Sequence, residues 1–409
     1  MSLRSDAQTI IAASIQAVQP DAAVKRALRG RDFPGRVVLA AAGKAAWQMA
    51  RAAQECLGDR MDTGVVVTKY GHVLGPIPGC TCYEAGHPVP DGNSFRGTQA
   101  VLDLVSGLTE GDTVIFLLSG GGSALFEKPL IPGEELQDIT SQLLSSGADI
   151  VEMNVIRKRL SAVKGGRFAR LCAPARVFAV VLSDILGDPL DMIASGPACA
   201  DRSTCEQALA IAEKYRLRLT PQAHELLGRE TPKELDNVET QITGSVRELC
   251  AAAARSAQEL GYEPVMLTDQ LCCQAREAGS FLASVARTHR GQGKKLAFLA
   301  GGETVVKLTG AGKGGRNQEL ALSAAQGIDG LDGVLVFSLG SDGTDGPTDA
   351  AGGVVDGQTA ARLREQGLSI HQVLEDNDAY HALAKADGLI VTGPTGTNVN
   401  DVAVVLIDI

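Results

Sequence analysis

Charged residues in two glycine-rich turns are the features of this sequence best suited to chemistry. Each turn follows a predicted strand, Thr304–Leu308 in the first case and Val334–Leu339 in the second. The charged residues of the turns are Arg316, Asp342, Asp345 and Asp349. Glycine lets backbone N–H groups approach an anion, and Mg²⁺ is usually held by one or two carboxylates together with phosphate oxygens. We therefore predict one nucleotide and metal site, with ordinary turn formation as the alternative. Its proposed phosphate contacts are Gly314 and Gly315, and its proposed metal ligands are Asp342 and Asp345.

A second candidate anion site follows the apolar run Thr113–Leu118, which is typical of a buried parallel strand. The next residues are Ser119, Gly120, Gly121, Gly122 and Ser123. Three successive glycines cost backbone entropy and add no packing. We interpret this loop as a backbone cradle for a carboxylate or phosphate. It is not a Walker loop, because no G-x-x-x-x-G-K-[ST] motif occurs in the chain.

Lys44 stands where a predicted strand, a tight turn at Gly43 and a helix follow one another. A cation at the positive end of a helix opposes the helix dipole, so local stability does not account for it. Lys44 therefore either contacts a phosphate or carboxylate or is solvated. His87, in a loop at a strand end, is either functional or structural.

Aspartates follow the predicted strand Arg176–Leu182. The turn after this strand contains Asp184, Asp188 and Asp191. Open α/β sheets bind ligands at the carboxyl ends of their strands, so we interpret at least one of these aspartates as a metal ligand or a general base. Asp191 is the candidate base.

A basic segment, residues 154–170, precedes that strand. Its helical apolar spacing leaves Lys158 off the buried face. A solvated face is one interpretation of the segment. Whether or not the face is solvated, Asn154 and the Lys164-Gly165-Gly166 stretch stand at its ends, within reach of a ligand.

The C-terminal turn contains Asn398, Asn400 and Asp401. It lies between the predicted strands Leu389–Thr392 and Val402–Ile407. An ordinary hairpin and a polar ligand site are equally open here, with Asn398 as the proposed ligand contact.

Composition and charge exclude several classes of protein. The chain has 409 residues, 44% of them hydrophobic, and a net charge of −10, which disfavours nucleic acid or an anionic membrane as a partner. Its nine scattered cysteines are typical of reduced thiols rather than disulfides or zinc ligands. We find no signal peptide or membrane span and predict a cytoplasmic protein.

Strand and helix patterns alternate along the chain, which indicates α/β domains. The length exceeds one ordinary core, so about two domains are expected. The polar stretch GRETPKELDNVET, residues 228–240, is the candidate linker, and a predicted strand at Gln241–Val246 opens the second domain. We place the domains at residues 1–235 and 236–409.

The segment from Gly310 to Gly315 contains a G-x-G-x-x-G pattern, which raises hydride transfer with a nicotinamide cofactor as an alternative. The acidic residue that a dinucleotide site needs about 20 residues further on comes too late, at Asp342. The loop also carries Lys313 and Arg316, so its charge favours a polyphosphate. A sensor that binds small hydroxy acids without turnover is a third alternative.

Several motifs, in order along nearly the whole chain, resemble those of the class II glycerate kinases, also called glycerate 2-kinases. They are SGGGSALFEKP, MNVIRKRLSAVKGGRFA, SDILGDPLDMIASGP, KGGRNQELAL, SLGSDGTDGPTDAAGG and TGPTGTNVNDV. The resemblance implies two dissimilar α/β domains, an N-terminal Rossmann-like domain with a mostly parallel sheet and a smaller C-terminal one, with an interdomain cleft. The carboxyl half of the family is known as the MOFRL domain, here at about 295–405. Members are often labelled hydroxypyruvate reductase, which keeps the NAD(P)H-dependent reductase as the alternative function.

The resemblance also implies ATP- and Mg²⁺-dependent phosphorylation of D-glycerate at the 2-hydroxyl, giving 2-phosphoglycerate. The family's cleft lysine matches Lys44, and the arginine of its GGRNQE motif matches Arg316. From the chemistry of phosphoryl transfer we expect Lys44 and the Ser119–Ser123 loop to bind the substrate carboxylate and Arg316 to stabilise the γ-phosphoryl group. The expected partners are small molecules. The oligomeric state is left open, with a homodimer as one alternative.

Overall fold

The computed structural model describes residues 2–408 and divides into two compact units. The first, called here the β1–β6 unit, comprises residues 23–183 and 188–243. The second, the β7–β12 unit, comprises residues 2–22, 184–187 and 244–408. Each unit is built on its own six-stranded sheet, which confirms the expected fold class of two different α/β domains.

The sheet of the β1–β6 unit has the strand order β3-β2-β1-β4-β5-β6. Its strands are β1 (Val37–Ala42), β2 (Thr63–Lys69), β3 (Cys80–Ala85), β4 (Thr113–Leu118), β5 (Arg176–Leu182) and β6 (Val238–Gly244). The pairings among β1 to β5 are parallel. β1 and β4 are buried at every position, as their unbroken apolar runs predict. The strand order reverses between them, and at such a point open α/β sheets commonly bind ligands beyond the carboxyl ends of their strands.

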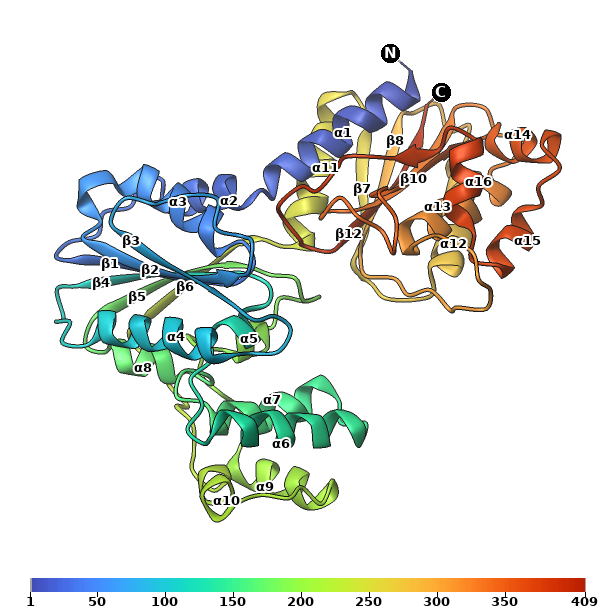
Figure 1. Cartoon of the computed structure of the whole chain (residues 1–409). Coiled ribbons are helices and arrows are strands. Elements are labelled where there is room, and N and C mark those ends of the chain that lie inside the picture. The colour runs from blue at the N-terminus through green and yellow to red at the C-terminus, as the bar shows by residue number, and fades with distance from the viewer. Residues whose placement is uncertain (1, 409) are drawn as a thin grey trace. The chain divides into compact units, whose positions relative to one another are not determined.

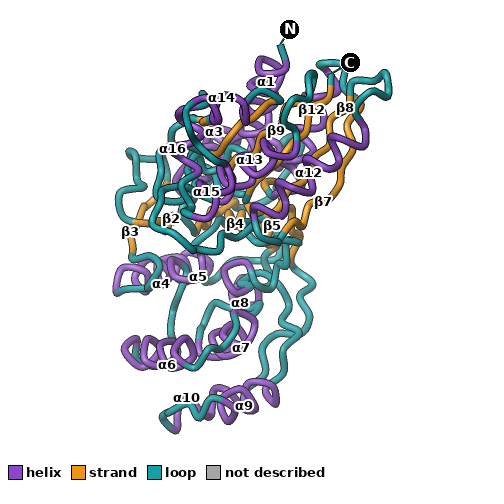
Figure 2. Tube along the Cα trace, turned by 90° about the vertical axis from the view of Figure 1, so that its right-hand side faces the viewer, coloured by secondary structure: helices purple, strands orange, loops and turns teal. Residues whose placement is uncertain are grey.

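Helices cover both faces of this sheet, and further helices form a separate layer (Figure 1). On one face lie α2 (Pro20–Leu28) and α3 (Ala46–Leu57), and on the other α4 (Gly92–Val105) and α8 (Arg167–Cys172). The separate layer, seen in Figure 2 with its long connecting loops, contains α6 (Gly133–Ser145), α7 (Ile150–Leu160), α9 (Cys205–Lys214) and α10 (Pro221–Leu227). Three short elements are α5 (Gly122–Leu125) and the 3-10 turns η1 (Gly58–Arg60) and η2 (Ile193–Ser195).

The β7–β12 unit has a mixed sheet in the order β11-β10-β9-β12-β8-β7. Its strands are β7 (Glu263–Leu271), β8 (Leu296–Gly302), β9 (Val334–Gly340), β10 (Gly352–Asp356), β11 (Leu389–Ile390) and β12 (Asp401–Ile407). β7 pairs with β8 in parallel, and the other pairings are antiparallel. One core contains α1 (Leu3–Ala17) and α11 (Val246–Glu259). The other contains α12 (Ala275–His289), α13 (Arg316–Gly327), α14 (Thr359–Glu365), α15 (Ile370–Glu375) and α16 (Ala379–Lys385).

The predicted strand Thr304–Leu308 is wrong, because β8 already ends at Gly302. Gly302 has a φ of 159° and lies so close to β7 that a Cβ atom there would be 2.1 Å from the Leu271 carbonyl oxygen. Beyond it the chain is irregular, with one isolated bridge at Val305. Val305 and Leu308 are 56% and 80% exposed, so their apolar pattern does not mark a buried strand.

The prediction of a C-terminal hairpin is also wrong. β11 pairs with β10 near one edge of the sheet, whereas β12 lies in the middle between β8 and β9. The reason is the burial of all seven residues of β12, which requires neighbours on both sides. The segment between the two strands is therefore a crossing loop rather than a hairpin turn.

The predicted strand after the candidate linker joins the first sheet as β6 instead of opening a second domain. Asn237 fixes its start, since its side-chain amide donates to the Ala169 and Ala175 carbonyls at 2.9 and 3.0 Å and its own carbonyl accepts from the Val177 N–H at 2.7 Å. The linker segment thus packs within the β1–β6 unit. The predicted domain boundaries, 1–235 and 236–409, differ from the limits of the two compact units. The division into these two domains stays a prediction.

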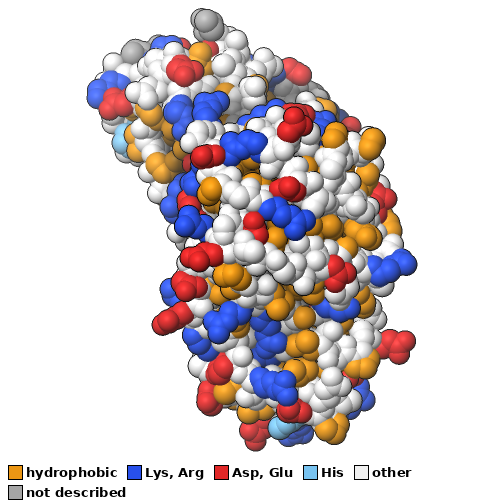
Figure 3. All heavy atoms as spheres, turned by 90° about the vertical axis from the view of Figure 1, so that its left-hand side faces the viewer, with side chains coloured by type: hydrophobic (Ala, Val, Ile, Leu, Met, Phe, Trp, Pro, Cys, Tyr) orange, Lys and Arg blue, Asp and Glu red, His pale blue; other side chains and the backbone are white. Residues whose placement is uncertain are grey.

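Three observations concern the predictions about charge, cysteines and membrane spans. Lys and Arg side chains are mixed with Asp and Glu on the face shown in Figure 3. All nine cysteines are free thiols. No helix within residues 2–408 is long and apolar enough to cross a membrane.

Candidate functional site

The lysine turn after β1 and the glycine loop after β4 lie side by side and are hydrogen-bonded to each other. The Lys44 N–H donates to the Gly120 carbonyl at 2.9 Å, and the Ala45 N–H donates to the Ser119 hydroxyl at 3.1 Å. Gly43 has a φ of 124°, and a Cβ atom there would lie 2.5 Å from the Ser119 carbonyl oxygen. Close packing of the two loops therefore accounts for Gly43.

Lys44 supplies an uncompensated charge at this point. Its side chain is partly buried, and it forms no ion pair with any residue of the described chain. A Cβ atom on Gly121 would lie 3.2 Å from the Lys44 side chain and 3.0 Å from the His87 ring, so both side chains border the glycine loop. Burial, together with the nearby Lys44 charge, lowers the pKa of His87. The local electrostatic field is therefore positive and suits an anion. Binding of a carboxylate or phosphate by Lys44 and the Ser119–Ser123 loop stays a prediction.

Asn154 reaches the end of the glycine loop through Ser195. The Ser195 hydroxyl donates to the Asn154 side-chain oxygen at 2.8 Å and lies 3.3 Å from the Ser123 hydroxyl. Ala194 and Ser195 have φ values of 50° and 62°, which are unfavourable for residues with a side chain. Tight packing holds them there, since the Ala194 methyl would lie 2.7 Å from a Cβ atom on Gly122.

Lys164 anchors the same loop from beneath. It is fully buried, and its ammonium group donates to the Ser123 and Phe126 carbonyls at 2.8 and 3.1 Å. It also pairs with Glu127 at 2.6 Å. Burial lowers the pKa of Lys164, against the opposing effect of Glu127. Lys164 thus holds the short helix α5 that carries Ser123, and it has no direct path to a ligand on the loop.

The solvated interpretation of the basic segment is wrong for Lys158, Arg159 and Lys164, which are 3%, 0% and 0% exposed. Lys158 lies between two carboxylates, 3.1 Å from Asp201 and 3.3 Å from Asp191. Helical periodicity misplaced it because a buried carboxylate partner, distant in sequence, offsets the cost of burying the ammonium group. Asp191 keeps 39% of its side chain exposed and stays the candidate base.

Arg316 lies at the start of α13, in a cavity of about 880 Å³ within the β7–β12 unit. Its guanidinium group donates to both oxygens of Asp401 at 2.6 and 3.0 Å and to Glu303 at 2.8 Å. Burial raises the pKa of Asp401 to about 6, although Arg316 opposes this rise. Arg316 is therefore held by two carboxylates, in contrast to Lys44.

The glycine-rich loop before α13 is already bonded to the protein. Asn377 accepts from the Thr309 and Gly310 N–H groups at 2.7 and 2.9 Å. The neighbouring aspartates accept from the Ala311 N–H at 3.1 Å and the Lys313 N–H at 2.9 Å. These N–H groups are not free for phosphate in this conformation. The G-x-G-x-x-G pattern also lacks the context of a dinucleotide fingerprint, because it begins eight residues after β8 ends at Gly302.

Asp345 is occupied by the beginning of α13. Its carboxylate accepts from the Asn317 and Gln318 N–H groups at 3.2 and 2.9 Å, and a Cβ atom on Gly315 would lie 2.3 Å from it. Burial raises the pKa of Asp345. Gly315 is thus needed for the approach of Asp345, a role that differs from the proposed phosphate contact. The contact of Gly315 and of its neighbour Gly314 with phosphate stays a prediction.

Asp342 fits Mg²⁺ better than Asp345 does. It borders the same cavity, is partly buried, and accepts only the Thr344 N–H at 3.0 Å among the hydrogen bonds that its side chain makes within residues 2–408. One carboxylate with a spare oxygen is enough when the substrate supplies phosphate oxygens. Both metal assignments stay predictions.

Asn398 is exposed, and its neighbour Asn400 is the buried amide of the C-terminal turn. The Asn400 amide donates to Glu303 at 3.2 Å and to the Asp184 carbonyl at 3.2 Å. Sequence reasoning did not predict Glu303, although a polar residue directly after a buried strand that ends in two glycines is a usable signal. It also missed Ser195 and Asp201, whose roles depend on contacts that no local pattern reveals.

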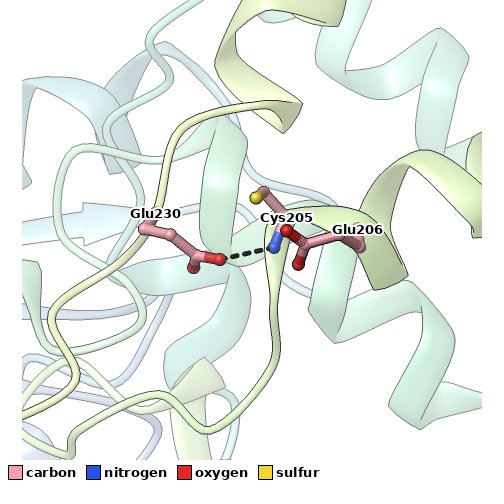
Figure 4. Close-up of side chains that lie close together, drawn as sticks. All are labelled: Cys205, Glu206 and Glu230. Carbon is pink, nitrogen blue, oxygen red and sulfur yellow. Dashed lines mark hydrogen bonds between the residues drawn. The ribbon is translucent and has the colours of Figure 1, made fainter.

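Cys205, Glu206 and Glu230 form a group whose spacing could hold a metal ion (Figure 4). Glu230 already accepts from the Cys205 N–H at 2.8 Å and pairs with Lys233 at 2.6 Å. Although burial opposes it, Lys233 and the Cys205 N–H lower the pKa of Glu230 to about 2. The negative charge is thus balanced by the protein itself, and the group fits a structural role.

Comparison with known proteins shows which family the chain belongs to. A family model described as a domain of unknown function (DUF4147) matches residues 6–228, and the MOFRL family model matches residues 296–401. The chain is 53% identical over 412 residues to the D-glycerate 2-kinase of Thermotoga maritima, with 99% of each chain covered. It is 39% identical over 435 residues to the glycerate 2-kinase of Pyrococcus horikoshii, covering 100% of this chain and 98% of the relative.

A crystal structure of the Thermotoga maritima glycerate kinase superposes with a TM-score of 0.95 at 52% identity, covering 99% of both chains. The chain therefore belongs to the class II glycerate kinase family, with a C-terminal MOFRL region. Other relatives carry a hydroxypyruvate reductase name, as the motif resemblance implied.

Proposed function

We propose that the protein transfers the γ-phosphoryl group of ATP to the 2-hydroxyl of D-glycerate, giving 2-phosphoglycerate and ADP. The observation that carries this proposal is the 53% identity, over essentially the whole of both chains, to a relative named D-glycerate 2-kinase. The positive charge of Lys44 beside the glycine loop of the β1–β6 unit supports it, because a small acid substrate needs a fixed anion site.

Lys44 and the Ser119–Ser123 loop are the proposed site for the glycerate carboxylate. Lys44 is partly buried and has no ion-pair partner within residues 2–408, so its charge is available to a ligand. The Ser119 hydroxyl is used by the Ala45 N–H. At the other end of the loop, Ser123 with Ser195 and Asn154 offers hydroxyl and amide groups that could orient the substrate hydroxyls.

Arg316 is the proposed stabiliser of the γ-phosphoryl group, with the nucleotide in the cavity of the β7–β12 unit. Asp401 fixes the guanidinium plane through two hydrogen bonds. The third bond goes to Glu303, which is 46% exposed on its side chain and could yield to a phosphate oxygen. Gly314 and Gly315 stay proposed contacts of the phosphates, and Asn398 stays a proposed contact of the ligand.

Mg²⁺ would be held by Asp342, with Asp345 as the second proposed ligand, and when bound it would neutralise charge on the phosphates. The residues of the chain would position the substrate and move one proton. The 2-hydroxyl oxygen forms a bond to the γ-phosphorus, the bond to the β–γ bridging oxygen breaks, and the hydroxyl proton passes to Asp191. The proposal requires residues of both units to act on the same reacting groups, so the expected interdomain cleft stays a prediction.

The alternative is a hydroxypyruvate reductase that uses NAD(P)H. The names of some relatives favour it. The structure offers it no dinucleotide fingerprint in the 310–315 segment, where the loop is irregular and its N–H groups are already bonded. The cytoplasmic location and the homodimer stay predictions, and nine free thiols fit a reducing compartment.

One pair of assays on the purified protein separates these functions. With ATP, Mg²⁺ and D-glycerate, we expect ADP release and a product that enolase converts without added phosphoglycerate mutase, which identifies the 2-phosphate. With hydroxypyruvate and NADH or NADPH, we expect no oxidation of the reduced cofactor. Cofactor oxidation without ADP release would establish the reductase. Binding of D-glycerate without either reaction would establish a sensor.

A further inference from the structure

A second cavity, of about 390 Å³, lies in the β1–β6 unit beside α5, α6 and α7. In Figure 1 these helices lie on the same side of the β1–β6 sheet. Its volume is within the range of small-molecule sites. Its wall is mostly apolar and is formed by Pro88, Val89, Pro90, Ala124, Leu136 and Leu144. Leu144 is 62% exposed and forms an apolar rim of the cavity.

Arg157 provides an unpaired cation in this apolar cavity. It is partly buried and makes no hydrogen bond or ion pair with any residue that the structure describes. Burial lowers the pKa of Arg157, and the attraction of Glu127 opposes the shift. A guanidinium group in such surroundings favours a planar anion that accepts two parallel hydrogen bonds, which is the geometry of a carboxylate.

Glu127 lines the same cavity and has one unpaired acceptor. The residue is 2% exposed, and one carboxylate oxygen pairs with Lys164 at 2.6 Å. The other oxygen, Oε1, is buried without a hydrogen-bond partner. Leaving a buried acceptor unsatisfied is unfavourable, so a donor supplied by a ligand would stabilise this oxygen. Lys164 already balances the charge, and a neutral hydroxyl donor therefore suits this oxygen better than a second ammonium group.

Three of the other polar side chains of the cavity already donate hydrogen bonds within the protein. The Thr140 hydroxyl donates to the Leu136 carbonyl at 2.8 Å, and the Ser141 hydroxyl donates to the Gln137 carbonyl at 2.9 Å. The Gln137 amide donates to the Pro90 carbonyl at 3.2 Å. The Ser123 hydroxyl lies 3.3 Å from the Ser195 hydroxyl, and Gln137 is exposed. We therefore assign recognition of a polar ligand chiefly to Arg157 and Glu127.

We propose that this cavity is a second binding site, which takes a small carboxylate that carries a hydroxyl group and a short apolar body. The carboxylate pairs with Arg157, the hydroxyl donates to Glu127 Oε1, and the apolar body packs on the wall formed by α6 and the 88–90 loop. This ligand class differs from D-glycerate, which has no apolar body, and the site differs from the proposed glycerate site at Lys44. The two sites share one border, since Ser123 ends the glycine loop and also lines the cavity.

Calorimetric titration of the full chain with 2-hydroxy-3-methylbutanoate tests the site. We expect one binding event. Removing the hydroxyl, as in 3-methylbutanoate, or the charge, as in the methyl ester of the probe, should weaken binding at least about tenfold, as expected when a buried partner is left unpaired. Arg157→Met should weaken it by a similar factor. Arg170→Met, which removes an exposed arginine of α8, is the matched control and should bind as the wild type does.

Two further variants keep the test decisive. Leu144→Trp fills the rim from an exposed position and should block the probe without unfolding the protein, even if Arg157→Met proves unstable. Lys44→Ala should bind the probe normally, which separates this site from the glycerate site whatever the outcome of the kinase assay. No binding of the probe to the wild type at millimolar concentrations would overturn the proposal. Unchanged binding by both Arg157→Met and Leu144→Trp, or one-site competition by D-glycerate, would also overturn it.

Discussion

The two cations that follow glycine-rich turns, Lys44 and Arg316, lie in opposite electrostatic surroundings. Lys44, in the β1–β6 unit, has no ion-pair partner within residues 2–408 and contacts a glycine loop whose packing leaves its charge uncompensated. Arg316, in the β7–β12 unit, makes three hydrogen bonds to two carboxylates, Asp401 and Glu303. The same sequence signature, a glycine turn followed by a cation and a helix, thus produces an unpaired charge in one unit and a paired charge in the other.

This difference indicates different tasks. An uncompensated lysine attracts an anion strongly and with little orientation, because an ammonium group is a compact point charge. A guanidinium group held by a buried carboxylate is oriented before any ligand arrives, which suits the stabilisation of a transition state. The more exposed of its two partners, Glu303, is the one that a phosphate could replace, whereas Asp401 is nearly buried. We therefore expect the two cations to respond differently to mutation.

The largest effect is expected for Lys44→Ala. Removal of the unpaired Lys44 cation beside the glycine loop should lower kcat/KM for D-glycerate by about 100- to 1,000-fold, the range for loss of a positioned charge. The melting temperature should stay within about 2 °C of the wild type, because no ion pair is broken. Lys25→Ala, which affects an exposed ion pair on α2 with Glu55, serves as the control. Steady-state kinetics with wild-type values for Lys44→Ala would remove the lysine from the site.

Arg316→Ala, unlike Lys44→Ala, should lower the stability of the protein as well as its activity. We expect kcat/KM to fall by at least about 100-fold. We also expect a loss of about 3 kcal/mol in the free energy of unfolding, because the buried Asp401 loses its partner. Urea titration and kinetics measure the two effects. The double variant Arg316→Ala/Asp401→Asn removes the unpaired charge and should recover stability but not activity. If Arg316→Ala is as stable as Lys44→Ala, the contrast between the two cations fails.

The pH dependence of the reaction should report on the carboxylate behind Arg316. Burial raises the pKa of Asp401 to about 6, so the group is ionised and holds Arg316 above that pH and is protonated below it. We expect kcat/KM to fall as the pH drops through about 6. In Asp401→Asn this step should disappear and the rate at high pH should be about tenfold lower, since the amide mimics the protonated acid. Asp356→Asn, at an ion pair with Arg362 in the same unit, is the control and should keep the wild-type profile.

Much of the fold follows from patterns that burial enforces along the chain. The apolar runs of β1, β4, β5 and β9 predicted buried strands, and the structure confirms them because residues in the middle of a sheet are covered on both faces. The prediction failed for the run at Thr304–Leu308, which is β-branched but includes Lys307. Val305 and Leu308 are exposed, and nothing local distinguishes an exposed valine from a buried one.

The candidate site was predictable to a similar, partial extent. Glycine turns after buried strands pointed to Lys44 and the Ser119–Ser123 loop, whereas Arg316 was found from a glycine turn after the wrongly predicted strand Thr304–Leu308. What the sequence did not reveal is which partners these residues have, because Asp401 is 85 residues from Arg316 and Asp201 is 43 residues from Lys158. Charge compensation depends on tertiary contacts of this kind. The buried Lys158 and Lys164 were accordingly misjudged as members of a solvated face.

The smallest effects are expected for two aspartates of the β7–β12 unit, Asp345 and Asp342. Asp345 acts as an internal anion at the start of α13. Asp345→Ala leaves the Asn317 and Gln318 N–H groups without their acceptor and should lower the free energy of unfolding by about 1–2 kcal/mol. Asp342→Ala should change stability by less than about 0.5 kcal/mol and should raise the Mg²⁺ concentration needed for half-maximal rate. Thermal unfolding and Mg²⁺ titrations of activity measure the two effects. If Asp345→Ala shifts the Mg²⁺ requirement as far as Asp342→Ala does, then Asp345 leaves the helix to bind the metal, and the charges of this unit are less firmly paired than the structure indicates.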